Sequence, residues 1–317
     1  MTDAHRQAHG ALAARAAIAS VSAALFLLLL KGYAAWATGS VAMLGSLADT
    51  GLDVIASLIT LYGVRYAALP ADDDHRFGHG KAEALAALFQ GGLITFSAVA
   101  IGWRAIDRLT DGETTARAEY GIGASAVAIV VTLCLLAYQR RVIARTGSVA
   151  IEADHVHYQS DLLLNLAVIA ALALEAFAGL AGADPVFGIA IAAWLLLGAW
   201  RASSRAVDQL MDKEWPEERR RQFVEVAARH PALRGIHDLR TRTSGSLNFV
   251  QFHVWVDPDM TVAKAHDVMD EVEEWLGREF PGTEILIHLD PEGQVDQPGN
   301  PLAETNLTPR PPRTGAP

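Results

Sequence analysis

Long runs of apolar residues fill the first two thirds of the chain, and from about Ala206 the pattern becomes that of a soluble domain. A helix needs about 20 mostly apolar residues to cross a hydrocarbon core about 30 Å thick. Some of these runs carry charges, so long amphipathic core helices remain an alternative for the second, third and fifth. The six candidate membrane helices span residues 12–36, 41–66, 82–109, 122–138, 149–178 and 186–201.

The arginine and lysine residues predict the orientation of these helices. They precede the first helix, lie between the second and third and between the fourth and fifth, and follow the sixth. The first-to-second and fifth-to-sixth loops contain neither residue type. Arg104, Arg108 and Arg117, near the third-to-fourth loop, oppose the trend but are outnumbered. Because positive residues favour the cytoplasmic side, both termini are predicted to be cytoplasmic.

The C-terminal third predicts a small α+β domain. A helical pattern begins at Glu217, two strand patterns at 235–244 and 248–257 flank a turn around Gly245, a helix spans 262–280, and a last strand spans 284–290. This α-β-β-α-β order is typical of a ferredoxin-like sandwich. Seven of the 13 prolines follow residue 290, so the tail is predicted to be disordered. The predicted domains are an N-terminal segment (1–11), a transmembrane domain (12–206), a cytoplasmic domain (207–291) and the tail (292–317).

Charge and cysteine content narrow the function classes. The net charge of −10 gives no basic surface for nucleic acid. Cys134 is the one cysteine, so no disulfide can form within the chain. A metal site must therefore use histidine and carboxylate side chains.

Among the ionisable residues inside predicted membrane helices are three carboxylates and one histidine. Asp49 and Asp53 are in the second helix, and His157 and Asp161 are in the fifth. A carboxylate at the centre of a membrane helix costs about 2.5–3.5 kcal/mol on insertion scales, which points to a function. Each pair is spaced i, i+4 and therefore shares one helix face. A hydrogen-bonded lock between the helices is the alternative.

The two pairs also agree in depth. Counted from opposite sides at about 1.5 Å per residue, they lie roughly 12–18 and 14–20 Å into the membrane, near its midplane. Three oxygen ligands and one nitrogen ligand suit a tetrahedral divalent ion, Zn²⁺ above all. Cd²⁺ and Fe²⁺ use similar ligands and remain open.

At these residues the sequence resembles the cation diffusion facilitator family, and within it the bacterial YiiP-type ferrous-iron and zinc efflux members. The resemblance covers about Ala13 to Pro291. The matching stretches are GSLADTGLDVIASL, PADDDHRFGHGKAEALAAL, ADHVHYQSDLLLN, HDLRTRTSG and ILIHLDP. The resemblance implies a multi-pass protein of the bacterial inner membrane that forms a homodimer through its C-terminal domain.

The resemblance also implies functions for particular residues. Asp49, Asp53, His157 and Asp161 match the family's transport site. A loop site falls on Asp72, His75 and His79, which on sequence alone could equally be an ordinary solvated loop. A cytoplasmic zinc site that helps hold two subunits together falls on His237, His253, His266, His288 and Asp290, with scattered surface histidines as the alternative.

A charge interlock between the two domains is implied at Lys81 and Asp212, with Arg242 joining it. Arg205 stands where an acidic partner is expected, which leaves the full network in doubt.

These observations predict export of a divalent metal by proton antiport with alternating access. The ligands bind metal only when deprotonated, so protons and metal compete for the same residues. A metallohydrolase is disfavoured because four ligands close the coordination shell and no separate general base accompanies them. A passive channel is disfavoured because tight coordination releases ions slowly. A membrane-bound metal sensor or scaffold remains the alternative, although it does not require ligands at the membrane midplane.

Overall fold

The computed structural model describes residues 2–38, 41–111, 122–178 and 183–292. The contacts within the chain divide it into two compact units. One unit holds Ala8–Asp208, and the other consists mainly of the residues from Gln209 onward. The exact limits of the four predicted domains stay predictions.

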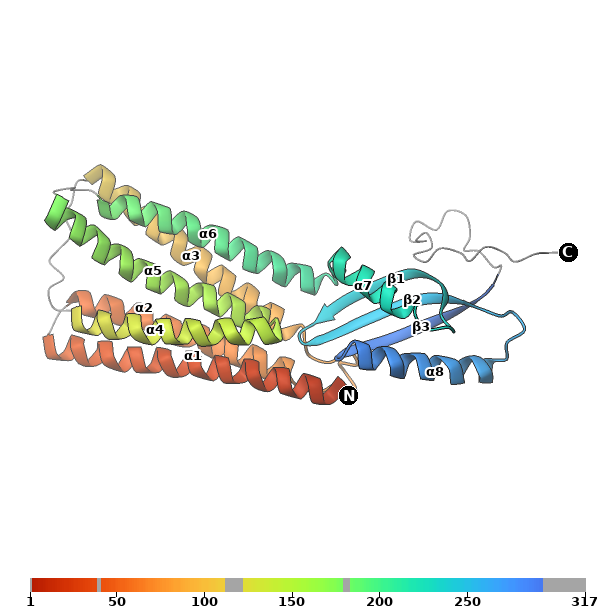
Figure 1. Cartoon of the computed structure of the whole chain (residues 1–317). Helices are drawn as coiled ribbons and strands as arrows, with labels where there is room; N and C mark the ends of the chain where they lie inside the picture. The colour runs from red at the N-terminus through yellow and green to blue at the C-terminus, as the bar shows by residue number, and fades with distance from the viewer. Residues whose placement is uncertain (1, 39–40, 112–121, 179–182, 293–317) are drawn as a thin grey trace. The chain divides into compact units, whose positions relative to one another are not determined.

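Long helices that lie alongside one another form the first unit (Figure 1). They are α1 (Thr2–Thr38), α2 (Val41–Ala67), α3 (Ala82–Asp111), α4 (Ile122–Thr146), α5 (Val149–Ala178) and α6 (Ala183–Leu210). All six predicted helices are therefore present. Several extend beyond the predicted apolar segments, because the helical backbone continues through polar residues at the ends. Gly147, with a φ of +62°, follows the last turn of α4, and its amide donates to the Ile143 carbonyl at 2.8 Å.

Among the described residues, four helical segments are long and apolar enough to cross a membrane by themselves. Their spans are Gln7–Trp36, Ala82–Asp107, Ala126–Thr146 and Pro185–Leu210. Helices α2 and α5 carry the four predicted transport residues.

Small residues bring the helices close together. Alanines of α1 and α5, among them Ala16, Ala17 and Ala150, are fully buried in a cluster that also contains side chains from α2, α3 and α4. On α3, a Cβ added at Gly91 would lie 2.2 Å from the Ser203 hydroxyl of α6. Without a hydrophobic driving force in lipid, such close approach is what stabilises helix pairs.

The second unit is a three-stranded sheet with two helices. Its elements are α7 (Glu217–Ala227), β1 (Arg234–Ser244), β2 (Leu247–Val256), α8 (Val262–Glu279) and β3 (Thr283–Pro291). The strand order is β1-β2-β3, with β1 antiparallel and β3 parallel to β2. The predicted α-β-β-α-β order is therefore present. The Thr261 hydroxyl caps α8 by accepting a hydrogen bond from the Lys264 amide at 3.3 Å.

The two faces of the sheet carry different side chains. On β2, Val250, Phe252 and Val254 are fully buried against α7 and α8, whose contributions include Phe223 and Leu276. Successive side chains of a strand point to opposite faces. The intervening residues, His253 among them, therefore occupy the face away from the helices.

Strand β1 is irregular beside His237, where its alternation of side chains between the two faces is interrupted. The register between β1 and β2 shifts on both sides of His237, and Asp238 has a φ of +48°. Gly235, at φ +59°, lies under the Trp255 ring, which would be only 2.0 Å from an added Cβ. A glycine is therefore required at that position.

The predicted disordered tail falls, apart from Glu292, outside the described residues, as does Arg117. Residues of the predicted N-terminal segment belong to α1 from Thr2 onward.

The core of the second unit predicts its sensitivity to mutation. Phe252→Ala should lower the free energy of unfolding of this unit by about 3–5 kcal/mol, because it removes a fully buried aromatic side chain and leaves a cavity. Pulse proteolysis of the full-length protein in increasing urea measures this change. Val262→Ala, at a side chain 87% exposed, is the control and should change the value by less than about 0.5 kcal/mol. Equal effects of the two substitutions would contradict the assigned core.

Candidate metal sites

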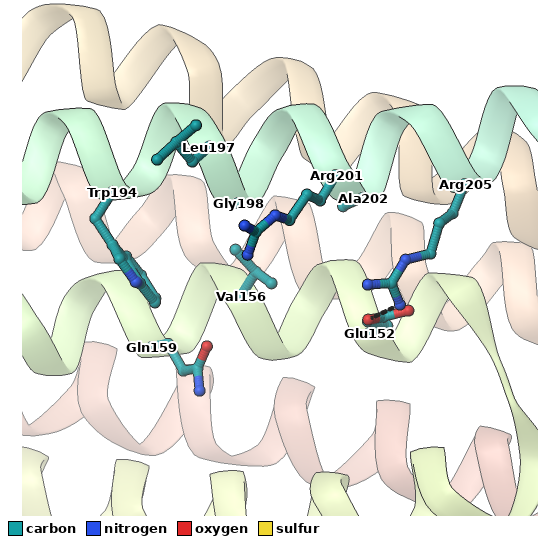
Figure 2. A pocket seen from close by; sticks show the side chains of 9 residues that line it. All are labelled: Glu152, Val156, Gln159, Trp194, Leu197, Gly198, Arg201, Ala202 and Arg205. Carbon is teal, nitrogen blue, oxygen red and sulfur yellow. Dashed lines mark hydrogen bonds and ion pairs between the residues drawn. The ribbon is translucent and has the colours of Figure 1, made fainter.

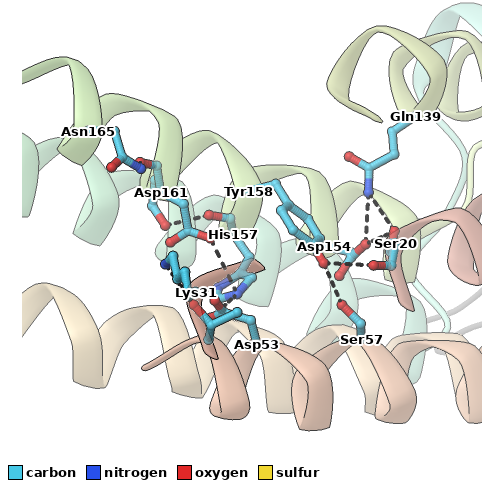
Figure 3. A network of polar contacts seen from close by, with 12 residues as sticks. Ser20, Lys31, Asp53, Ser57, Gln139, Asp154, His157, Tyr158, Asp161 and Asn165 are labelled. Carbon is cyan, nitrogen blue, oxygen red and sulfur yellow. Dashed lines mark hydrogen bonds and ion pairs between the residues drawn. The ribbon is translucent and has the colours of Figure 1, made fainter. Parts of the chain in front are cut away.

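Three predicted ligands meet between α2 and α5. Nε2 of His157 lies 3.1 Å from Oδ1 of Asp53 and 4.0 Å from Oδ2 of Asp161. One possible ligand atom from each residue lies within 4.8 Å of the other two. His157 is buried, and both carboxylates are partly buried (Figure 3). The arrangement offers one nitrogen and two oxygen donors to a single ion.

Asp49 is the predicted transport residue that the structure leaves out of this group. It is exposed, and it lies one helical turn before Asp53, about 6 Å along the axis of α2. Residues spaced i, i+4 share a helix face, but they do not by themselves reach the same point. Three of the four residues are therefore together, and the fourth is adjacent.

A buried polar cluster adjoins the site, and its members come from four helices. Oδ2 of Asp154 accepts hydrogen bonds from the Ser20 hydroxyl at 2.6 Å and the Gln139 amide at 2.8 Å. The Tyr158 hydroxyl donates to the Ser20 carbonyl at 3.0 Å and lies 2.9 Å from the Ser57 hydroxyl. The cluster joins α5 to α1, α2 and α4, and thus fixes the helix that carries His157 (Figure 3).

The sequence pattern did not lead to a predicted role for Asp154. Its side chain is completely buried, and its Oδ1 has no hydrogen-bond partner among the described residues. The signal was available, because Asp154 is a further acidic residue inside a predicted membrane helix, three residues before His157. Lys31 was missed for a similar reason. It is a basic residue within the apolar run of α1, and its ammonium group donates to Thr50 of α2 at 2.7 Å.

The loop between α2 and α3 brings together Asp72, His75 and His79. Oδ1 of Asp72 lies 3.2 Å from Nδ1 of His75, and Oδ2 lies 3.3 Å from Nε2 of His79. The carbonyl of Pro70 lies 3.1 Å from Nδ1 of His79. A carbonyl only accepts, so Nδ1 carries the proton in this contact and Nε2 is left as the donor to a metal.

The same loop folds around the Asp72 carboxylate. The His75 amide donates to it at 2.7 Å, and this hydrogen bond lowers the pKa of Asp72 below its usual value, assisted by the neighbouring imidazoles. The Asp74 amide also donates to it, at 3.1 Å. The carboxylate is therefore fixed in its ionised, metal-binding form.

The sheet of the second unit aligns three histidines across its strands. His237 pairs with His253 in the antiparallel register, and His253 pairs with His288 in the parallel register. Oδ2 of Asp290 lies 3.1 Å from Nε2 of His237 and 2.9 Å from Nδ1 of His253. Oδ1 of Asp290 lies 3.4 Å from Nε2 of His288. The sheet register thus assembles residues that are far apart in the sequence.

His266 lies apart from this row in the described structure. It is on α8, where its Nδ1 lies 3.5 Å from Oδ1 of Asp270, and its side chain is 73% exposed. The compact group consists of His237, His253 and Asp290, with the His288 ring centroid 4.4 Å from that of His253. Helix α8 packs on the opposite face of the sheet from this row, which explains the separation.

The residues of the predicted charge interlock belong to two different units, and the structure gives contacts within each unit alone. Arg242 lies 3.5 Å from Asp212 in the second unit, and Lys81 directly precedes α3 in the first. The link between the two units stays a prediction. Arg205, for which an acidic residue had been expected, forms an ion pair with Glu152 of α5.

Comparison with known families identifies the chain. The cation efflux transmembrane domain matches residues 17–211, and the cation efflux cytoplasmic domain matches residues 215–292. The chain belongs to the cation efflux, or cation diffusion facilitator, family.

Among the relatives of this cation efflux protein are pumps from several bacteria. Cation-efflux pump FieF of Klebsiella pneumoniae is 42% identical over 289 residues, which cover 91% of this chain and 96% of that protein. The pump of the same name from Pectobacterium atrosepticum is 42% identical over 282 residues, covering 89% and 94%. The zinc form of CzrB, described as a putative zinc transporter, is a solved structure with 39% identity over 27% of this chain and 99% of its own, at a TM-score of 0.24.

The loop geometry predicts how metal binding there depends on pH. Because the pKa of Asp72 is lowered, its carboxylate stays ionised throughout the range from pH 5.5 to 7.5. Binding must instead weaken as pH falls, since a metal binds only the neutral imidazole and protons compete with it for the ring nitrogen. Cd²⁺ titrations of protein with and without His75→Ala at both pH values measure the loop contribution. A loop affinity that is unchanged at pH 5.5 would contradict this assignment.

Proposed function

We propose that this protein exports a divalent metal ion, zinc above all, across the bacterial inner membrane in exchange for protons. The observation that carries the proposal is the meeting of Asp53, His157 and Asp161 inside the helical unit. Family membership and the naming of its relatives as cation-efflux pumps support export as the direction. Cd²⁺ and Fe²⁺ are alternative substrates for the same donors.

The proposal includes six membrane spans with both termini in the cytoplasm. Helices α2 and α5, at 27 and 30 residues, have sufficient length to cross the bilayer. Their charged side chains face each other, which is the arrangement that makes such residues tolerable in a membrane. In this topology Asp53 and His157 lie near the midplane, where a transport site is accessible from each side in turn.

Competition between metal and protons couples the two fluxes. Zinc requires ionised carboxylates and a neutral imidazole. Carboxylates that lie close together repel each other when ionised, so the empty site takes up protons. Release of metal on the outside is then accompanied by proton binding, and the protons leave on the cytoplasmic side when the next metal binds.

Membrane potential bears on the proton stoichiometry. Export of one Zn²⁺ for one proton moves one net positive charge outward. An inside-negative potential opposes that step by about 2.3 kcal/mol per 100 mV. Two or more protons per metal remove this opposition.

In this proposal Asp49 supplies the fourth ligand. It lies on the same helix as Asp53 and one turn away, so a small rotation or shift of α2 against α5 moves it toward the site. The site would then have three ligands in one stage of alternating access and four ligands, with Asp49, in another.

The cytoplasmic row of histidines is proposed as a second, regulatory zinc site. His237, His253, His288 and Asp290 fit zinc because a carboxylate oxygen of Asp290 lies between 2.9 and 3.4 Å from a ring nitrogen of each histidine. The site lies on the sheet face away from α7 and α8, where a second copy of the domain can pack. Metal bound there would stabilise the homodimer, since ligands that bind only the assembled form shift the equilibrium toward it.

Zinc flux into proteoliposomes with an imposed pH gradient tests the transport proposal. We expect the wild-type protein to move zinc in response to the gradient. Asp53→Ala and Asp49→Ala should each lower the flux by at least about tenfold, because each removes a ligand. Asp73→Ala is the control, since its side chain is 98% exposed in the α2–α3 loop and should leave the flux unchanged.

Two outcomes would contradict the transport proposal in different ways. Zinc flux that ignores the pH gradient would exclude antiport. Intact zinc binding without flux in the wild-type protein would favour the sensor or scaffold function.

The dimer dissociation constant, measured with and without zinc, tests the regulatory site. Zinc should tighten the wild-type dimer and activate transport, and the double variant His253→Ala/His288→Ala should lose both responses. His266→Ala should have the smallest effect, because His266 pairs with Asp270 away from the row. Zinc-dependent activation that survives the double substitution would rule out this site as the regulator.

A further inference from the structure

A pocket of about 290 Å³ lies between α5 and α6, and the metal groups do not contribute to it. Helix α5 lines it with Glu152, Val156 and Gln159, which follow one another at helical spacing (Figure 2). Helix α6 contributes two arginines and an apolar surface that includes Trp194. The pocket belongs entirely to the first unit.

The pocket lies on a different face of α5 from the transport ligands. Each residue of a helix turns the side chain by about 100°. Val156 therefore points well away from His157, and Gln159 points away from both His157 and Asp161. Two guanidinium groups in the lining would also repel a metal cation. The chemistry of the pocket accordingly favours an anion.

One of the two arginines is already neutralised. Arg205 forms an ion pair with Glu152 across the pocket. Arg201, one turn earlier on α6, makes no hydrogen bond or ion pair with any residue that the structure describes. Its guanidinium reaches back into the pocket beside Val156 (Figure 2). The lining thus retains one positive charge with free donors.

The remainder of the lining is apolar. Val156, Trp194 and Leu197 extend from Arg201 toward the other end of α6. Arg201 comes 16 residues after Pro185, the start of the apolar span, which places it about 24 Å along the helix. In the proposed topology this is close to the cytoplasmic headgroup level of a core about 30 Å thick.

We propose that this pocket binds an anionic phospholipid of the cytoplasmic leaflet. The headgroup phosphate accepts hydrogen bonds from Arg201, and Gln159 offers a further amide donor. One acyl chain lies against Val156, Trp194 and Leu197. Basic pockets between membrane helices on the cytoplasmic side suit such headgroups. Inorganic phosphate would use the guanidinium alone, so the apolar part of the lining favours a lipid.

Fluorescence quenching by brominated lipid tests this site in the full-length protein in detergent. The probes are dibrominated phosphatidylglycerol and dibrominated phosphatidylcholine. The fluorescence of Trp194 is obtained by subtracting the tryptophan fluorescence of the Trp194→Phe variant from that of the wild-type protein. We expect phosphatidylglycerol to quench at about fivefold lower concentration than phosphatidylcholine. Arg201→Gln should abolish this preference, and Arg201→Lys should retain most of it. Arg145→Gln, at an exposed arginine in the last turn of α4, is the matched control and should retain it fully.

The outcomes separate the possible ligands. Equal quenching by the two lipids, or a preference that survives Arg201→Gln, would overturn the proposal. Displacement of phosphatidylglycerol by millimolar inorganic phosphate would also overturn it in favour of an anion site. Since the assay measures no transport, its result is independent of whether the protein exports zinc.

Discussion

A charged group inside a hydrocarbon bilayer is stable only if it is paired, hydrogen-bonded or hydrated. In the proposed topology this constraint determines how α2 and α5 pack, because each helix carries acidic or imidazole side chains near its middle. The pairing of Asp53 with His157 satisfies it, and Asp161 completes the group from one turn along α5. The same constraint explains the cluster around Asp154, where Ser20 and Gln139 surround a buried carboxylate. Packing and ligand placement in the helical unit are thus two aspects of one requirement.

In the second unit, the sheet both forms a hydrophobic core and aligns the histidines. The twofold alternation of a strand directs Phe252 into the core and His253 to the opposite face. The strand register then aligns His253 with His237 and His288, although more than 30 residues separate His288 from His253. A hydrophobic core on one face therefore leaves a row of candidate ligands on the other. The helical unit brings its candidate ligands together by helix packing, whereas the sheet does so by register.

Much of this arrangement could be predicted from the sequence. Apolar runs predicted all six long helices, and the i, i+4 pairs predicted the meeting of Asp53 with His157 and Asp161. The helix ends were less predictable, because hydropathy reports the lipid-facing part of a helix and α4 continues through polar residues to Thr146. Asp49 and His266 could not be placed, since helical spacing gives the face of a residue but not its reach across to a neighbour. The pairing of Arg205 with Glu152 depends on how α5 and α6 pack, which no local pattern specifies.

The central claim is that the residues between α2 and α5 hold either a metal ion or protons. Calorimetric zinc titration in buffers of different ionisation enthalpy tests it directly, in a background in which His75, His253 and His288 are alanine so that binding to the membrane site dominates. If protons leave as zinc binds, the apparent binding enthalpy varies linearly with the ionisation enthalpy of the buffer, and the zinc-binding signal disappears when His157 is also replaced by alanine. Zinc binding to this site with an enthalpy independent of the buffer would show that no protons are exchanged and would contradict the account.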